Sequence, residues 1–438
     1  MTGNVALPTV ARPGVSRTLR AGEWLNEHAR TIALVAVAVS VMIAGGYALF
    51  LGTELRYFDE QVYVQLTQSL AHNHVFSLDG GVQSTAYRPP GYAFILLPVY
   101  LVSGGSVLAM RMIGVAALAG SVWFTYLIGR RVHSPATGAV AAAVVACYPL
   151  MIYTATALYP QVPALFLLLV MAETGMRALP ADGATGRHRL LMAVVAGLSG
   201  GLLTLAVPTF APTVILLVLW LVWRQWRTTR RIAWRAVAVL IVAVAVLPLG
   251  WTARNAAVLH AFVPVSTNDG VNLLLGNSPH ATPGAGRNTD ISSYENVAKQ
   301  RQLSEVELDR YYTREGLAWI HAHPGHATTL FAEKFVDNFS YQNDLVTTGQ
   351  SSAAQDVVSA LSYYPILALA LLRIALYRRF PLHPVEKMVI GTILVNVLVL
   401  SVFYTRIRFR VPLDALTIVL AASTVTHFLL RRDEQRAD

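Results

Sequence analysis

The sequence predicts an all-α polytopic membrane protein, and its composition and its long apolar runs are the two observations behind this prediction. Of its 438 residues, 55% are hydrophobic and only 13% are charged, and the mean hydropathy is +0.50. These values exclude an ordinary soluble globular protein. Several apolar runs reach the roughly 20 residues that a helix needs to cross a hydrocarbon core of about 30 Å. A transmembrane barrel would show short alternating segments instead.

The formal net charge of +10 could indicate a nucleic-acid partner, but the basic residues gather at the ends of apolar runs and in short loops. That distribution is typical of membrane orientation and of contact with anionic lipid. We therefore expect a lipid bilayer as partner and no nucleic acid. Cys147 is the only cysteine and lies in an apolar run, which excludes an intrachain disulfide and a cysteine-based metal site.

About ten apolar runs are long enough to be predicted as membrane spans. They cover residues 31–52, 106–129, 136–157, 161–179, 190–207, 211–223, 233–251, 357–376, 388–404 and 410–430. One further run, 89–105, holds a helical part of about 13 residues, which would be roughly 20 Å long and too short to span. We interpret it as an interfacial or re-entrant helix.

The short loops define an orientation. With 89–105 not counted as a span, every arginine-rich loop faces the cytoplasm, as the positive-inside rule requires. The run from Thr31 to Gly52 is too long for the core of a signal peptide, so we expect a retained first helix. We predict a multi-pass protein of the plasma membrane with both termini cytoplasmic and any active site extracytoplasmic. The predicted regions are a cytoplasmic tail (1–30), an N-terminal membrane core (31–251) with a first outer loop (53–105), an outer cap (252–356) with helices at 303–320 and 326–340, C-terminal helices (357–430) and a second tail (431–438).

The stretch "RYFDEQVYVQ" places Asp59 and Glu60 where the first span leaves the membrane. They could be solvated charges at a helix end. However, the same outer segment holds Arg88 in "YRPPGY", whose two prolines restrict the backbone around this arginine. A carboxylate held by cations can act as a general base toward a hydroxyl group. Arginines suit a phosphate because the planar guanidinium binds two of its oxygens, although arginines also commonly anchor helices at lipid headgroups.

Five segments carry a resemblance to a known family. They are "FDEQVYVQLTQSLAHNHVFS", "AYRPPGYAFILLPVYLVSGGSVLAMRMIGVAALAGSVWFTYLIGRRV", "LPLGWTARNAAVLHAFVPVSTNDGVNLLLGNSP", "WIHAHPGHATTLFAEKF" and "RFRVPLDALTIVL". With these, the chain resembles the GT-C glycosyltransferases that use polyprenyl-phosphate sugars, in particular bacterial protein-mannosyltransferase-like and aminoarabinose-transferase-like enzymes. The resemblance implies a GT-C-like fold with about ten transmembrane helices, interfacial helices and a mostly helical extracytoplasmic cap.

The resemblance also implies roles for individual residues. Asp59 matches the acidic residue proposed as catalytic base, and Glu60 completes an Asp-Glu pair like that of the protein mannosyltransferases. Arg88 matches the basic position that contacts the carrier phosphate, and Arg254 and Arg408 are candidates for the same phosphate. Further candidates for substrate contact are Arg56, Tyr87 and Gln161.

Gln161 departs from the family pattern, because many relatives carry a second acidic residue near this position. An amide cannot bind a metal as a carboxylate does, so we predict no obligatory metal or other cofactor. Asp79 or Glu60 could replace the missing carboxylate. The histidines of "HAHPGH" do not have the spacing of a tetrahedral zinc site.

The predicted function is inverting transfer of a hexosyl or pentosyl group from a polyprenyl-phosphate donor to a cell-envelope glycan, lipid or protein. The alternatives are a polymerase or ligase that uses polyprenyl-diphosphate oligosaccharides, and a non-enzymatic transporter or flippase of lipid-linked sugars. A transporter would be expected to carry charged or broken helices near the bilayer midplane, and the sequence shows almost none.

Overall fold

The computed structural model describes residues 17–180, 186–342 and 353–434, and within these ranges it is helical without strands. The predicted all-α class is therefore confirmed. The helices are α1 (Arg17–Glu27), α2 (Ala29–Leu51), α3 (Phe58–Asn73), α4 (Gly91–Ser103), α5 (Val107–Val132), α6 (Pro135–Ala146), α7 (Pro149–Thr156), α8 (Gln161–Ala178), α9 (Arg187–Ala206), η1 (Pro208–Phe210), α10 (Ala211–Thr229), α11 (Trp234–Leu259), α12 (Asp269–Gly276), η2 (Gly286–Asn288), α13 (Ser292–Gln300), α14 (Glu305–Ala322), α15 (Pro324–Asp337), α16 (Ala353–Ala375), η3 (Leu376–Arg378), α17 (Pro384–Val402) and α18 (Ile407–Glu434).

Each of the ten predicted spans is helical. Within the described residues, eight helices are long and apolar enough to cross a membrane, and the bent pair α6 and α7 makes a ninth. The tenth predicted span is α8, which is less apolar because its last turns carry Glu173 and Arg177. The spans carry large apolar side chains on their outer surfaces, such as Phe50 on α2 and Leu361 on α16, which are 76% and 71% exposed. Such surfaces fit a multi-pass protein in lipid.

The pair α6 and α7 is bent by 58°. The helix ends at Ala146, and Pro149 opens the next one. Proline has no N–H to donate to the preceding turn, so the ladder of α6 cannot continue through it. The bend carries the chain from α7 toward Tyr159 and the start of α8, where the candidate site lies.

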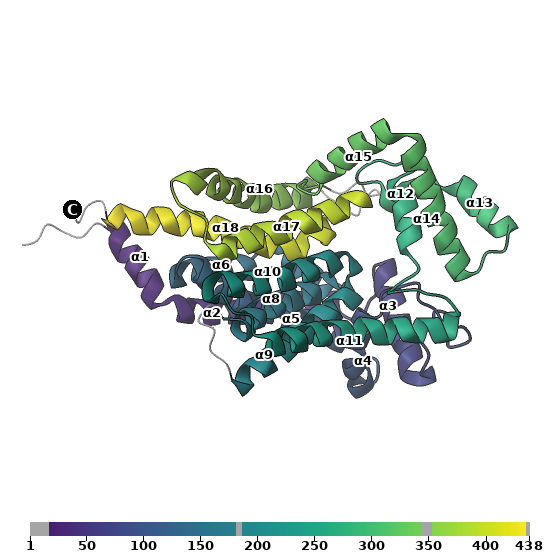
Figure 1. The fold of residues 1–438 in the computed structure, drawn as a ribbon, viewed down its shortest axis with the longest axis horizontal. Coiled ribbons are helices and arrows are strands. Elements are labelled where there is room, and N and C mark those ends of the chain that lie inside the picture. Colours follow the sequence, from purple (N-terminus) through teal and green to yellow (C-terminus); the bar gives the residue numbers. More distant parts are fainter. Residues whose placement is uncertain (1–16, 181–185, 343–352, 435–438) are drawn as a thin grey trace, which may run out of the picture.

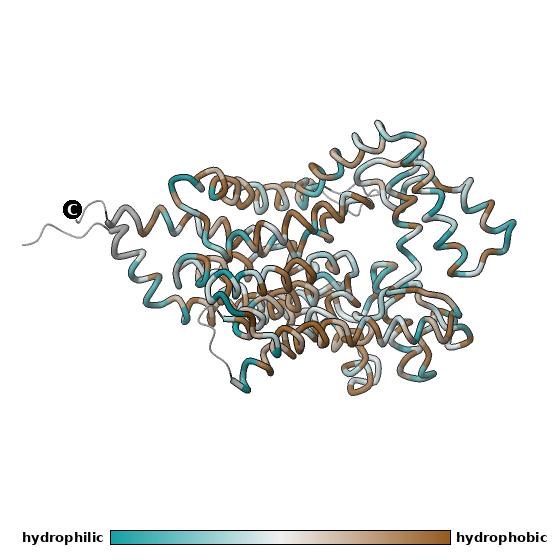
Figure 2. The backbone as a smooth tube through the Cα atoms, in the orientation of Figure 1, coloured by the Kyte–Doolittle hydropathy of each residue, from teal (hydrophilic) through white to brown (hydrophobic). Residues whose placement is uncertain are grey.

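The long helices form a bundle with two different ends (Figure 1). The helix α1 and the C-terminal part of α18 lie at one end, and α3, α12, α13 and α14 lie at the other. Figure 2 shows hydrophobic residues along the bundle and hydrophilic residues at both ends and over α13 and α14. Hydrophilic segments therefore occupy both ends of the apolar bundle.

The short run 89–105 forms α4, an apolar helix of 13 residues. Its first residue, Gly91, lies directly against the end of α9: a Cβ atom there would be 2.4 Å from the backbone nitrogen of Ala206. Only glycine allows this approach. The predicted length of the helix is confirmed, while its interfacial position stays a prediction.

The stretch after α11 contains the two predicted helices as α14 and α15, together with α12 and α13, which the sequence did not indicate. The helix α12 packs tightly on α14, because a Cβ at Gly270 would lie 2.1 Å from the backbone oxygen of Asp309. This packing fixes the start of α12 beside the candidate site.

Candidate functional site

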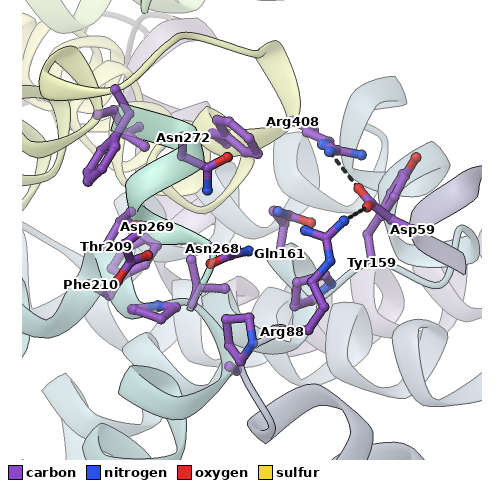
Figure 3. A pocket seen from close by; sticks show the side chains of 18 of the residues that line it. Asp59, Arg88, Tyr159, Gln161, Thr209, Phe210, Asn268, Asp269, Asn272 and Arg408 are labelled. Atoms are coloured by element: carbon purple, nitrogen blue, oxygen red, sulfur yellow. Dashed lines mark hydrogen bonds and ion pairs between the residues drawn. The ribbon is translucent and has the colours of Figure 1, made fainter. Parts of the chain in front are cut away.

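Asp59, Arg88 and Arg408 form one cluster, which we call the Asp59 cluster (Figure 3). Asp59 lies in the first turn of α3 and accepts a hydrogen bond from each guanidinium, one on each carboxylate oxygen. The bond from Arg408 Nη2 measures 2.7 Å. Burial alone would raise the pKa of Asp59, but the positive charges of Arg408 and Arg88 outweigh it and hold the pKa below its ordinary value. The carboxylate is therefore ionised at neutral pH.

The two arginines keep unused donors. Arg88 Nε and Arg408 Nε are buried, and neither donates to an acceptor within the described parts of the chain. A buried donor without an acceptor is costly, so these groups favour an additional acceptor between them. Arg408 also lies over the ring of Tyr159, with 4.6 Å between the guanidinium carbon and the ring centre. This contact limits the orientations that the guanidinium can take.

The segment 85–88, which we call the strap, positions Arg88. Glu305 at the start of α14 accepts bonds from the hydroxyl of Thr85 and, at 2.8 Å, from the backbone N–H of Ala86. Arg254 Nη1 donates to the Thr85 carbonyl oxygen at 2.8 Å. The Glu305 carboxylate thus links the strap to α14, and the Arg254 guanidinium links it to α11.

Two cavities meet at the Asp59 cluster, since all three of its side chains line both. The larger cavity has a volume of about 810 Å³ and extends between α2, α7 and α16. Two more arginines, Arg287 and Arg406, line it. The smaller cavity has a volume of about 150 Å³ and is lined by the start of α8, η1, α12 and the end of α17.

Glu60, which the sequence predicts as catalytic, lines neither cavity and is 1% exposed. Its carboxylate accepts hydrogen bonds from the backbone N–H groups of Arg56, Tyr57 and Leu158 and from Arg111 Nη1, the last at 2.9 Å. Glu60 is the third residue of α3 and caps its N-terminus. This geometry does not support direct catalysis by Glu60, because its carboxylate is sealed and fully bonded.

The structure separates the remaining candidates. Arg254 lines neither cavity; besides its bond to the strap it lies over Trp251, 4.7 Å from the ring centre, so its geometry favours a structural role over phosphate contact. Arg56 is exposed and also lines neither cavity. Tyr87 lines the larger cavity and Gln161 the smaller one.

Several polar cavity residues were not singled out from the sequence. Among them, Asn268, Asp269 and Asn272 belong to "STNDGVN" and line the smaller cavity, and Arg287 belongs to "PGAGRNTD" and lines the larger one. Asn, Asp and Gly are typical of turns, so their local sequence does not indicate a site.

Across the described ranges, no three His, Cys, Asp or Glu side chains form a group that could hold a metal ion. That the protein needs no metal stays a prediction from the sequence.

Comparisons with known proteins agree with this architecture. Residues 87–251, less than half of the chain, match the family model described as dolichyl-phosphate-mannose-protein mannosyltransferase. No curated protein sequence is significantly similar. The apo crystal structure of the Archaeoglobus fulgidus oligosaccharyltransferase matches with a TM-score of 0.55 and 14% identity, over 95% of this chain and 52% of that one.

The structure of ArnT from Cupriavidus metallidurans bound to undecaprenyl phosphate matches with a TM-score of 0.42 and 14% identity, over 93% of this chain and 78% of that one. The chain spans about half the length of the oligosaccharyltransferases that it matches. The predicted resemblance to the GT-C glycosyltransferases is confirmed by the fold and by the family model together.

Proposed function

We propose, from this GT-C fold and the geometry of its site, that the protein is an inverting glycosyltransferase. It would move a sugar from a polyprenyl-phosphate donor to a cell-envelope acceptor on the outer face of the plasma membrane. One observation carries the proposal: an ionised carboxylate lies between two arginines with unused donors, at the junction of two cavities. The family model, named for transferases that use dolichyl-phosphate mannose, supports the class of donor.

The larger cavity is suited to the lipid end of the donor. It is bounded by α2 and α16, whose outer surfaces carry exposed apolar side chains such as Ile43 and Val358, both also lining the cavity. A polyprenyl chain can therefore enter sideways from the bilayer. Its phosphate would meet the positive charges of Arg88 and Arg408, with Arg287 and Arg406 nearby.

The chemistry follows from the charges. Asp59 removes the proton of an acceptor hydroxyl, and the acceptor oxygen forms a bond to the anomeric carbon from the face opposite the phosphate. The bond between that carbon and the phosphate oxygen breaks, and its electron pair leaves with the polyprenyl phosphate. The configuration is inverted. Negative charge grows on the phosphate as the bond breaks, so fixed guanidinium groups stabilise the transition state more than the ground state.

Donor binding would also change the base. Asp59 and a phosphate compete for the same two guanidinium groups, each of which donates one bond to Asp59 in the present structure. A phosphate that takes up part of their charge, and adds its own, raises the pKa of Asp59. The carboxylate becomes a stronger base once the donor is bound.

The orientation is part of the proposal. The helix α3, whose first turn carries Asp59, lies toward the end of the bundle that holds α12 to α14, and α1 and the end of α18 lie at the opposite end (Figure 1). Basic residues such as Arg130 and Arg131, in the last turn of α5, lie at the other ends of the spans. By the positive-inside rule we expect these residues in the cytoplasm and the cluster outside.

The test is reconstitution of the purified protein in liposomes with labelled polyprenyl-phosphate sugars and an extract of envelope acceptors. We expect transfer of the label to an acceptor, and equal transfer, within about twofold, after chelation of divalent cations. Movement of the labelled lipid across the bilayer without transfer would support a flippase instead. Transfer only from diphosphate-linked oligosaccharides would support a polymerase or ligase.

A further inference from the structure

One carboxylate in the smaller cavity has no hydrogen-bond partner among the described side chains. Asp269, the first residue of α12, lines this cavity and forms no hydrogen bond or ion pair within the described residues. Its neighbour Gly270 is anchored, because the Gly270 N–H donates to Asp309 Oδ1 at 2.7 Å. The Asp269 side chain is exposed to the cavity, yet the surrounding protein limits its contact with bulk water. This burial and the like charge of Asp309 raise the pKa of Asp269 to about 6.

A second acceptor in the same cavity also has no donor. Gln161, the first residue of α8, is 6% exposed, and its Oε1 atom is buried without a partner within the described residues. The amide lines the cavity near Arg88 (Figure 3). A buried carbonyl oxygen without a hydrogen bond costs free energy, so this atom favours a ligand that donates.

The cavity thus has two chemically different sides. The unused guanidinium donors belong to the Asp59 cluster, while Asp269 lies across the cavity from Asp59 and Arg408 (Figure 3). A ligand that complements both sides accepts hydrogen bonds at one end and donates them at the other. A sugar phosphate has this arrangement, because its phosphate accepts and its ring hydroxyl groups donate.

The volume and the walls fit a single sugar ring. A water molecule needs about 10–15 Å³ of such space, so the cavity volume of about 150 Å³ corresponds to about ten water positions. That is the size of one monosaccharide and far too small for a polyprenyl chain. Phe210, Phe403 and Tyr404 supply apolar walls, as is usual in small-molecule sites with a few placed polar groups.

We infer that the smaller cavity binds the sugar ring of the donor, and that Asp269 and Gln161 select a ring whose hydroxyl groups donate to them. This rests on the proposed function, because the phosphate must lie at the Asp59 cluster for the ring to reach the smaller cavity. The ligand class is a neutral hexose or pentose. A ring that carries a carboxylate, such as a uronic acid, is repelled by Asp269.

The experiment is a binding measurement on the full chain in lipid nanodiscs. The probes are a bare polyprenyl monophosphate and chain-matched lipids that carry mannose, glucose, galactose or arabinose. We expect the unchanged protein to bind at least one sugar-bearing lipid about tenfold or more tighter than the bare lipid, as hydrogen bonds to a charged group allow. Asp269→Ala should remove this preference and leave the affinity for the bare lipid within about twofold.

Two further variants provide a second test and a control. Gln161→Leu should lose part of the preference. Asp309→Asn is the matched control, because it removes a charge beside Asp269 but lines neither cavity and can still accept from Gly270; it should keep the full preference.

The outcomes separate this inference from the proposed function. The inference is overturned if Asp269→Ala keeps the preference, if it weakens both kinds of lipid equally, or if the unchanged protein prefers none of the sugars over the bare lipid. Failure of the unchanged protein to bind any of these lipids would contradict the proposed function instead.

Discussion

Asp59 and Glu60 are adjacent in the sequence, lie in the same turn of α3 and have opposite surroundings. Glu60 is sealed against Arg111 and accepts four hydrogen bonds. Asp59 faces two cavities and, among the described residues, accepts only the two bonds from its arginines. Each carboxylate oxygen has about two positions for accepting a bond, so Asp59 keeps capacity for a substrate and Glu60 keeps almost none. The difference separates a carboxylate available for chemistry from one that holds the fold together.

The sharpest test of this comparison is Asp59→Asn. The amide cannot accept the proton of the hydroxyl group, so we expect the transfer rate to fall by about 10²–10⁴-fold, the usual contribution of a general base. Binding of bare polyprenyl phosphate should persist, because both arginines remain. Steady-state transfer and lipid binding are the two measurements, and a variant that transfers at the normal rate would remove Asp59 from the mechanism.

The next largest effect is expected for Arg408→Gln. Loss of one fixed charge beside the leaving phosphate should lower the rate of transfer by about 10²-fold. Arg56→Gln is the control, since Arg56 is an exposed arginine three residues before Asp59 and lines neither cavity. Equal losses in the two variants would show that general positive charge, not this position, matters.

Glu305→Ala tests whether the strap must be held in place. The variant removes both oxygens that accept from Thr85 and Ala86, so Arg88 should shift and the rate of transfer fall by about tenfold. Glu307→Ala, on the same helical turn, should change the rate little, because the Glu307 carboxylate caps α14 through its bonds to Ser304 and makes none to the strap within the described residues. A fall confined to thermal stability, with unchanged rate per folded molecule, would contradict a positioning role for Glu305.

The smallest effect on the rate is expected for Glu60→Gln, and it completes the comparison. The variant breaks a buried ion pair and should lower the free energy of unfolding by about 3–5 kcal/mol. The rate per folded molecule should stay within about twofold. Thermal unfolding followed by activity measurement of the folded fraction checks both statements, with the exposed Glu54→Gln as control. A loss of rate as large as that of Asp59→Asn would show that Glu60 takes part in catalysis.

The sequence was sufficient for the spans and for the short set of charged candidates that includes the Asp59 cluster. Hydropathy locates spans because lipid permits little else. Asp59, Glu60 and Arg88 stand out as charges beside a predicted span, whereas Arg254 and Arg408 became candidates through the resemblance to a known family. The number of clear spans is lower than predicted, because Pro149 divides one run and the charges of α8 weaken another.

The sequence could not distinguish Asp59 from Glu60, or Arg408 from Arg254. Consecutive residues of a helix point about 100° apart, so which one faces a cavity depends on how the helix is rotated against its neighbours. Asp269 was missed for a different reason. Its role depends on contacts between α12 and α14, while its local sequence is that of an ordinary turn.

The two arginines that hold Asp59 enter the structure at very different stages of synthesis. Arg88 lies 29 positions after Asp59, whereas Arg408 follows it by 349 positions and lies at the start of α18. A nascent chain in which α18 has not yet been made contains Asp59 and Arg88 but not Arg408. Under the proposed mechanism the site is therefore incomplete until α18 is inserted, and because 72% of this span is buried against its neighbours, its removal should also destabilise the bundle.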